Sequence, residues 1–135
     1  MSTKLHKASC HCGAVSIEAE FDLMEGTGRC NCSICKKARW WGKSVKPEQV
    51  RAIHGAENTF GYQFGTHAID LRNCKTCGLR VYGKGHIKEI GGDFVAINVA
   101  CLDTASDEDL ASAPIHYSNG RDNDWMHEPE VKSFL

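Results

Sequence analysis

The sequence predicts a mainly β fold built as a single domain. Short runs rich in β-branched and aromatic residues recur between glycine and asparagine residues, which is typical of short strands. Glycine is frequent, with 13 residues, whereas proline is rare, with 3. Helical signals are weak, and 135 residues correspond to about one domain. We therefore expect one β domain over residues 1–135.

Three segments have the pattern expected of strands. Residues 14–21 alternate apolar and polar side chains, as a half-buried strand does. Residues 79–82 are expected to leave a cysteine-containing turn as another strand. Residues 94–100 form the most apolar run of the chain, and we expect them to be the central strand.

Other segments predict a hairpin and two short helices. Residues 59–64 and 67–72 alternate around a Gly65-Thr66 turn, which indicates a β-hairpin. Ser33 is expected to cap one helical turn, and Ser106 another with an acidic first turn that runs to Leu110. The segment after position 113 is polar, and three apolar residues are expected to anchor it: Trp125, Phe134 and Leu135.

Composition and charge restrict the partners. The hydrophobic fraction is 41%, the charged fraction is 24% and the formal net charge is −1, as in a soluble globular protein. A near-neutral chain lacks the basic field that nucleic acid requires, and no apolar run approaches the length of a membrane span. Residues 1–7 are polar and lack the apolar core of a signal peptide. We therefore expect a cytoplasmic protein without nucleic-acid or membrane partners.

Seven of the eight cysteines fall into three clusters, and Cys101 stands alone. In a reducing cytosol, clustered cysteines bind metal or carry out chemistry more often than they form disulfides. Cys10 and Cys12 are also too close in sequence to pair without strain, and so are Cys30 and Cys32. The clusters therefore predict metal sites.

The first and third clusters predict one closed zinc site. Two close cysteine pairs separated by a long span are the usual frame of a tetrahedral structural zinc. Gly13 and Gly78 follow the pairs and let the backbone curl around the metal. The four expected ligands are Cys10, Cys12, Cys74 and Cys77. The alternative is a redox-active Cys-x-x-Cys formed by the last two.

The central cluster predicts an open zinc site with three protein ligands, Cys30, Cys32 and Cys35. An exchangeable fourth position is typical of catalytic zinc. Three thiolates weaken the acidity of the metal toward water, so this ligand set suits binding and deprotonating a thiol. The alternative is a closed site completed by a histidine or by Cys101, although a buried apolar role fits Cys101 better.

Several residues near the open site are candidates for binding substrate or transferring a proton. Four of them follow the cluster directly and are candidate substrate-binding residues: Lys36, Lys37, Arg39 and Trp40. The cations could hold substrate carboxylates or form a solvated face. The Trp40-Trp41 pair could line a pocket or fill the core. Among the histidines, His116 is the candidate proton donor, and the others give no reason to expect a functional role.

The cysteine-containing motifs resemble those of the glutathione-dependent formaldehyde-activating enzyme family, which also includes centromere protein V. The motifs lie at residues 10–15, 30–37 and 74–78, and the similarity continues into residues 114–116 and Trp125. The resemblance implies a β-tent fold of coiled antiparallel sheets. It also implies structural zinc at Cys10, Cys12, Cys74 and Cys77, and catalytic zinc at Cys30, Cys32 and Cys35.

The resemblance implies carbon–sulfur lyase chemistry, in which glutathione adds to formaldehyde to give S-(hydroxymethyl)glutathione. In this interpretation the open zinc site binds a small-molecule thiol as its thiolate, the thiolate attacks an aldehyde, and His116 supplies the proton. The alternative is a non-catalytic, zinc-stabilised module that binds protein. A nucleic-acid-binding zinc module is disfavoured because phosphate contacts need clustered cations.

Overall fold

The computed structural model describes residues 3–135; Met1 and Ser2, which begin the polar N-terminal segment, lie outside the described residues. Within residues 3–135, the strands form a three-stranded and a seven-stranded sheet. The smaller sheet contains, in spatial order, β1 (Lys4–Ser9), β2 (Ser16–Phe21) and β5 (Val50–His54). The larger sheet contains, in spatial order, β10 (Ile115–Ser118), β3 (Thr27–Cys30), β4 (Gly42–Val45), β9 (Gly92–Asn98), β8 (Arg80–Ile87), β7 (Ile69–Cys74) and β6 (Thr59–Tyr62).

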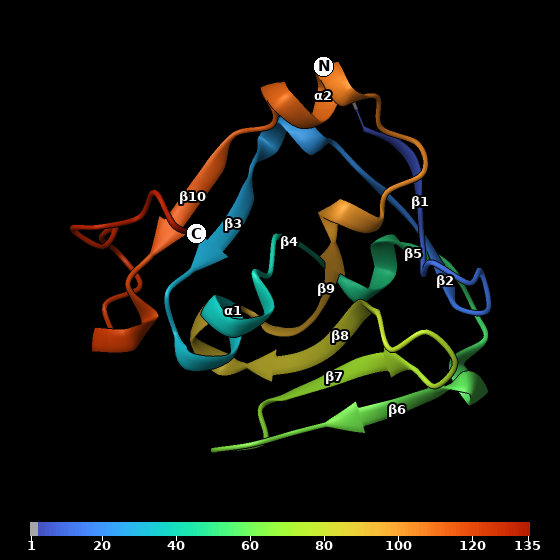
Figure 1. Ribbon diagram of the computed structural model, residues 1–135, viewed down its shortest axis with the longest axis horizontal. Helices are drawn as coiled ribbons and strands as arrows, with labels where there is room; N and C mark the ends of the chain where they lie inside the picture. The colour runs from blue at the N-terminus through green and yellow to red at the C-terminus, as the bar shows by residue number, and fades with distance from the viewer. Residues whose placement is uncertain (1–2) are drawn as a thin grey trace.

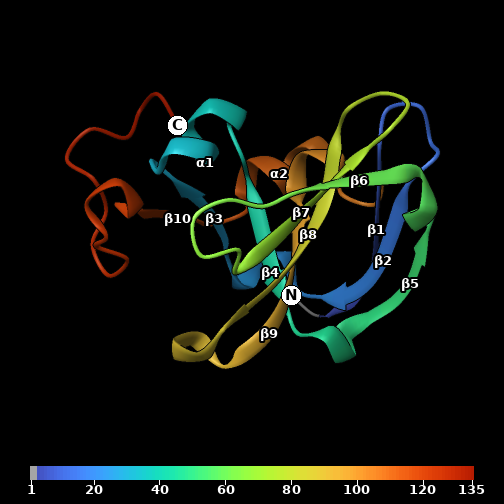
Figure 2. The same ribbon diagram turned by 90° about the horizontal axis from the view of Figure 1, so that it is seen from below.

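The two sheets share one hydrophobic core. In Figure 1 the smaller sheet stands on one side, β3 and β10 lie on the other, and α2 (Asp107–Ser112) lies at the top between them. Seen from below, β1, β2 and β5 run together along one side of the molecule (Figure 2). Side chains from both sheets, such as Phe21 and Ile97, belong to the same buried cluster. The predicted mainly β fold of antiparallel sheets is confirmed, with one parallel pair between β3 and β10.

The predicted strands form where the alternation indicates them. β2 begins at Ser16, pairs on both sides, and buries Ile17, Ala19 and Phe21 toward the core. Its polar residues alternate with these because successive side chains of a strand point to opposite faces. β9 is the fourth of the seven strands, so the prediction of a central strand is confirmed.

The predicted hairpin is confirmed, with a longer turn than expected. β6 and β7 pair antiparallel from Thr59 opposite Cys74 to Tyr62 opposite Leu71. The connection takes up residues 63–68, because both strands end short of the Gly65-Thr66 turn. The hairpin delivers Cys74 to the turn that leads into β8.

Two helices match the predicted positions, and one cap differs. Ser106 caps α2 by accepting the backbone N–H of Asp109, whose side chain accepts the backbone N–H of Ser106 in return. α1 spans Ser33–Ala38, but its N-cap is Cys32 and not Ser33. The prediction for Ser33 is therefore wrong, because the cysteine that ends the extended segment already occupies the cap position. No helix in the described part of the chain is long and apolar enough to cross a membrane.

The C-terminal segment is held by polar contacts more than by buried apolar side chains. Trp125, expected as an anchor, is 53% exposed, but one edge of its ring lies against Gly120. Phe134 is 37% exposed, and its backbone oxygen accepts a hydrogen bond from Arg39 Nη1 at 3.1 Å. Lys36 Nζ lies 5.7 Å from the centroid of the Phe134 ring. The tail therefore rests on the end of α1.

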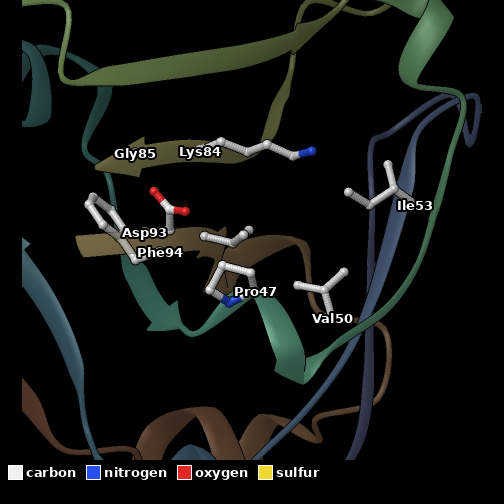
Figure 3. A pocket seen from close by; sticks show the side chains of 8 residues that line it. Pro47, Val50, Ile53, Lys84, Gly85, Asp93 and Phe94 are labelled. Carbon is white, nitrogen blue, oxygen red and sulfur yellow. The ribbon is translucent and has the colours of Figure 1, made fainter. Parts of the chain in front are cut away.

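A groove with a volume of about 380 Å³ lies between the two sheets. Figure 3 shows its wall of apolar side chains, including Val50, Ile53 and Phe94, with Lys84 and Asp93 beside them. The lining contains no cysteine. This groove is therefore distinct from the metal-binding candidates described below.

His6 is a buried titratable group outside the cysteine clusters. It is 3% exposed, its ring stacks on Phe21 at 4.5 Å, and its Nδ1 lies 2.7 Å from Thr104 Oγ1. The backbone N–H of Lys7 donates to the same oxygen, so we assign the hydroxyl as donor to a neutral imidazole. Burial, with a smaller contribution from the charge of Lys4, lowers the pKa of His6 below its usual 6.5.

We expect His6 to make stability depend on pH. Because its pKa is lower in the folded state, the unfolded chain takes up a proton first as the pH falls through 6.5, and stability decreases below that value. The slope contributed by one such group is at most about 1.4 kcal/mol per pH unit. Denaturant unfolding between pH 7.5 and 5.5 should show a shallower decline for His6→Gln than for the native chain. The same slope in both, with exposed His67→Gln as control, would contradict this role.

Candidate metal centres

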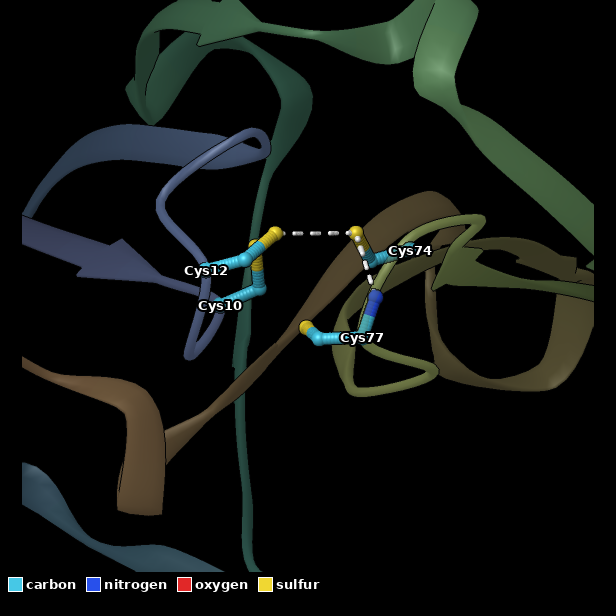
Figure 4. A group of neighbouring side chains, drawn as sticks. All are labelled: Cys10, Cys12, Cys74 and Cys77. Carbon is cyan, nitrogen blue, oxygen red and sulfur yellow. Dashed lines mark hydrogen bonds between the residues drawn. The ribbon is translucent and has the colours of Figure 1, made fainter.

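Four cysteine sulfurs meet where the turn after β1 faces the turn between β7 and β8. Figure 4 shows the side chains converging from these two turns. The sulfurs all lie within 4.8 Å of one another, and we call this group the closed cluster: Cys10, Cys12, Cys74 and Cys77. The structure thus joins two segments that are far apart in the sequence, as the pairing of the first and third motifs predicts.

The geometry of the closed cluster fits a tetrahedral metal ion. Cys12 Sγ lies 3.6 Å from Cys10 Sγ and 3.6 Å from Cys74 Sγ. Thiolates bound to zinc at about 2.3 Å are about 3.8 Å apart at the corners of a tetrahedron. These two sulfur–sulfur distances are therefore close to those that a tetrahedral zinc site requires.

The two turns also supply backbone donors to the sulfurs. The N–H groups of Cys12 and Leu79 donate to the Cys77 sulfur and lower its pKa to about 6. The N–H groups of Cys77 and Thr76 donate to the Cys74 sulfur and lower its pKa as well. Because a thiolate is the metal ligand, these donors stabilise the ionised form that a metal needs.

Glycine closes each of the two turns. Gly13 has φ +83° and donates its N–H to Cys10 O at 3.1 Å, and Gly78 has φ +80° and donates to Cys74 O at 2.9 Å. Residues with a side chain rarely adopt this left-handed conformation. Gly13 and Gly78 therefore allow the left-handed backbone that each turn needs, as the sequence predicts.

The three remaining clustered cysteines form a second group at the junction of β3 and α1. The sulfurs of Cys30, Cys32 and Cys35 lie within 4.8 Å of one another, and we call them the open cluster. Cys30 ends β3, Cys32 is the N-cap of α1 and Cys35 lies in its first turn. One continuous segment supplies all three, as the sequence predicts.

The thiols of the open cluster shift one another's pKa values in different directions. Hydrogen bonds with Cys30 and then with Cys35 place the pKa of Cys32 far below its usual range. A hydrogen bond with Cys32 raises the pKa of Cys30, and bonds with Cys30 and Cys32 raise that of Cys35. The three thiols therefore titrate as one coupled group. A cation on the three sulfurs would favour their ionised forms.

Neither alternative fourth ligand lies in the open cluster. Within residues 3–135, no histidine nitrogen and no sulfur of Cys101 joins the three sulfurs at ligand distance. Cys101 is buried, and its Sγ lies 3.9 Å from the backbone oxygen of Arg80. The structure therefore places Cys101 in the core, in agreement with the apolar role expected for it.

The C-terminal segment fixes the open cluster from one side, through a residue that the sequence analysis did not single out. Asn31 is buried, its Nδ2 donates to Asn119 Oδ1 at 2.9 Å, and its Oδ1 accepts the N–H of Arg121 at 3.0 Å. Gly120 lies so close that a methyl group on it would come within 2.6 Å of Cys30 Sγ. The only sequence signal for Asn31 was its place between two cysteines.

Trp40 lines two cavities, one of which is also lined by Cys30 of the open cluster and the other by Cys77 of the closed cluster, while Trp41 packs against the core. The smaller cavity has a volume of about 140 Å³, and Cys30, Ser118 and Trp40 are among its lining residues. The larger has a volume of about 420 Å³ and contains Trp40 and Arg80 in its lining. Trp40 therefore lines a pocket and Trp41 fills the core, so each of the two expected roles belongs to one residue of the pair.

The predicted cations and His116 lie around the open cluster without touching its sulfurs as ligands. All three cations are exposed, and Lys36 and Arg39 also contact Phe134. His116 is an exposed residue of β10, on the same strand face as Ser118, whose Cα pairs with Cys30. The structure therefore brings the predicted proton donor to the strand next to the cluster.

Comparison with known proteins agrees with this arrangement. The family model of the glutathione-dependent formaldehyde-activating enzyme matches residues 5–119, which include both cysteine clusters. The crystal structure of a Rhodobacter sphaeroides protein is similar to this chain, with a TM-score of 0.68 and 32% sequence identity. The match covers 82% of this chain and 99% of that one. The chain therefore belongs to the glutathione-dependent formaldehyde-activating enzyme family.

Proposed function

We propose that this protein is a zinc-dependent carbon–sulfur lyase that adds a thiol to an aldehyde, with glutathione and formaldehyde as the leading pair. The observation that carries the proposal is the open cluster, whose three sulfurs lie together beside a cavity that Cys30 itself lines. Three ligands with adjacent free space are typical of catalytic zinc, whereas four ligands are typical of structural zinc. The family membership supports the same assignment.

In this proposal the closed cluster has a structural role. Its four sulfurs join the turn after β1 to the turn before β8, so a metal there links the two sheets. The reduced thiols of both clusters require a reducing compartment, for which we propose the cytoplasm.

The reaction transfers no electrons to or from the protein. The sulfur of the thiol forms a bond with the carbonyl carbon, the carbon–oxygen π pair moves to the oxygen, and this oxygen takes up a proton. A zinc ion held by Cys30, Cys32 and Cys35 would supply an ionised thiol at neutral pH. His116 is our candidate for holding the proton, from the strand that pairs with Cys30 in β3.

One surface favours a second candidate function, a protein-binding module. Three exposed aromatic side chains alternate along the edge strand β6 and the loop after it: Phe60, Tyr62 and Phe64. Exposed aromatic residues at a sheet edge are typical of protein contacts. In this alternative both clusters stabilise the fold and neither exchanges a ligand.

Cobalt substitution separates the two functions. We expect added glutathione to change the visible spectrum of the cobalt-loaded protein, because a thiol enters the fourth position of the open cluster. The thiol adduct of formaldehyde also forms without a catalyst, so its rate should be measured as exchange at equilibrium by NMR. Cys101→Ser serves as a matched control that keeps all seven clustered sulfurs. An unchanged spectrum together with no faster exchange would exclude the lyase and favour the binding module.

A further inference from the structure

Arg80 places a partly buried cation beside the open cluster. It begins β8 three residues after Cys77, and its guanidinium carbon lies 5.6 Å from the centroid of the Trp40 ring. Burial lowers the pKa of Arg80, and the nearby sulfur of Cys35 opposes this shift. A guanidinium stays protonated in proteins, so a full positive charge lies at this position.

One donor of the Arg80 guanidinium has no acceptor within residues 3–135. Its Nε is buried and makes no hydrogen bond. A buried donor without a partner costs about 1–3 kcal/mol, and most such donors in folded proteins are satisfied. Nε itself is covered, but Arg80 also lines a cavity, so the other donors of its guanidinium can meet an acceptor that comes from outside the chain.

The cavity around Arg80 has the composition of an anion site. Its volume is about 420 Å³, and the lining contains Arg39, Arg80 and two asparagines, no aspartate or glutamate, and Cys77 of the closed cluster. Cavities of this size accommodate small organic molecules. The indole of Trp40 shields one side of the guanidinium from water, which strengthens its attraction for an anion.

Trp40 also connects this cavity to the open cluster. It lines the larger cavity with Arg80 and the smaller one with Cys30. A ligand with its sulfur at the cluster and its carboxylate at Arg80 would therefore lie along a single indole. Of the three cations that the sequence suggested for this task, Lys36 and Arg39 already contact Phe134, and Lys37 is exposed.

We propose that Arg80 is a specificity-determining residue, which binds a carboxylate of the thiol substrate and so selects anionic over uncharged thiols. This inference rests on the proposed lyase function. A guanidinium can donate two parallel hydrogen bonds to one carboxylate, and such charge-assisted pairs are among the strong ones. The residue acts by binding and leaves the addition step itself unchanged.

Direct binding tests the anion site without catalysis. S-methylglutathione carries the carboxylates of glutathione but no free thiol, and its affinity can be measured by calorimetry. We expect Arg80→Gln to weaken binding about tenfold or more, and Arg80→Lys to recover part of the loss. Arg121→Gln removes an exposed positive charge near the same cluster and should change affinity less than twofold. Equal affinity in the native chain and Arg80→Gln would overturn the assignment.

Kinetics then separates specificity from a general effect on the cluster. We expect Arg80→Gln to raise KM for 3-mercaptopropionate about tenfold with kcat unchanged, while KM for uncharged 2-mercaptoethanol stays the same. Equal losses for both thiols would mean that Arg80 acts on the metal cluster or the fold, and would overturn the proposal. If the native protein accelerated neither reaction but still bound S-methylglutathione through Arg80, the lyase function would fail and the anion site would stand.

Discussion

Replacing Cys77 with serine is expected to lower the free energy of unfolding on the order of 5 kcal/mol, because structural zinc contributes its binding energy to folding. Cys77 belongs to the closed cluster, which joins the turns of the two sheets. A serine oxygen is a poorer zinc ligand than a thiolate, and the backbone N–H groups of Cys12 and Leu79 lose the sulfur they stabilise. Metal analysis and thermal melting should show a lost metal equivalent and a lower melting temperature.

Cys101→Ser is the matched control for this experiment. Cys101 is buried in the core beside the closed cluster but contributes no sulfur to either cluster of the described residues. It should keep both metals and lose at most about 1–2 kcal/mol from placing a hydroxyl in the core. If Cys77→Ser melted like the native chain and kept its metal, the structural role of the closed cluster would be refuted.

Replacing Cys32 with serine is expected to abolish thiol-dependent activity and leave a folded protein with one metal equivalent. Cys32 lies at the centre of the open cluster, as the N-cap of α1. The three sulfurs come from one short segment, so a metal there closes no long loop and restrains the unfolded chain little. Serine is also a favourable N-cap, which offsets part of any local loss.

Circular dichroism, metal analysis and the exchange rate of the thiol adduct check this outcome together. The loss of catalysis should be complete to the uncatalysed rate, while the melting temperature stays close to that of Cys101→Ser. An unfolded Cys32→Ser protein would indicate that the open cluster also has a structural role, and would favour the protein-binding alternative. A folded variant with unchanged exchange would remove the cluster from the reaction.

The local sequence pattern was sufficient to predict strands, a hairpin and a helix cap, because these elements depend on interactions between residues close in sequence. The alternation in residues 14–21, the β6–β7 hairpin and the capping box at Ser106 each depend on residues close in sequence. The cysteine spacing likewise predicted two clusters, because neighbouring cysteines separated by one or two residues can reach a common metal from one turn. The N-cap of α1 was predicted one residue too late, at Ser33. The N-cap is Cys32, because Cys32 is the last residue with an extended backbone before the helix begins.

The sequence by itself therefore determined which cysteines group together, the mainly β fold and the family. Only the tertiary structure decided what surrounds the open cluster. Asn31 finds its partners in the C-terminal segment, and Arg80 meets Trp40 from another strand. Such contacts leave no periodic signal, because they depend on how the paired strands place distant segments side by side. The sequence alone does not show the role of Asn31 or Arg80. That role follows from whether the packed sheets place a hydrogen-bond partner beside the side chain.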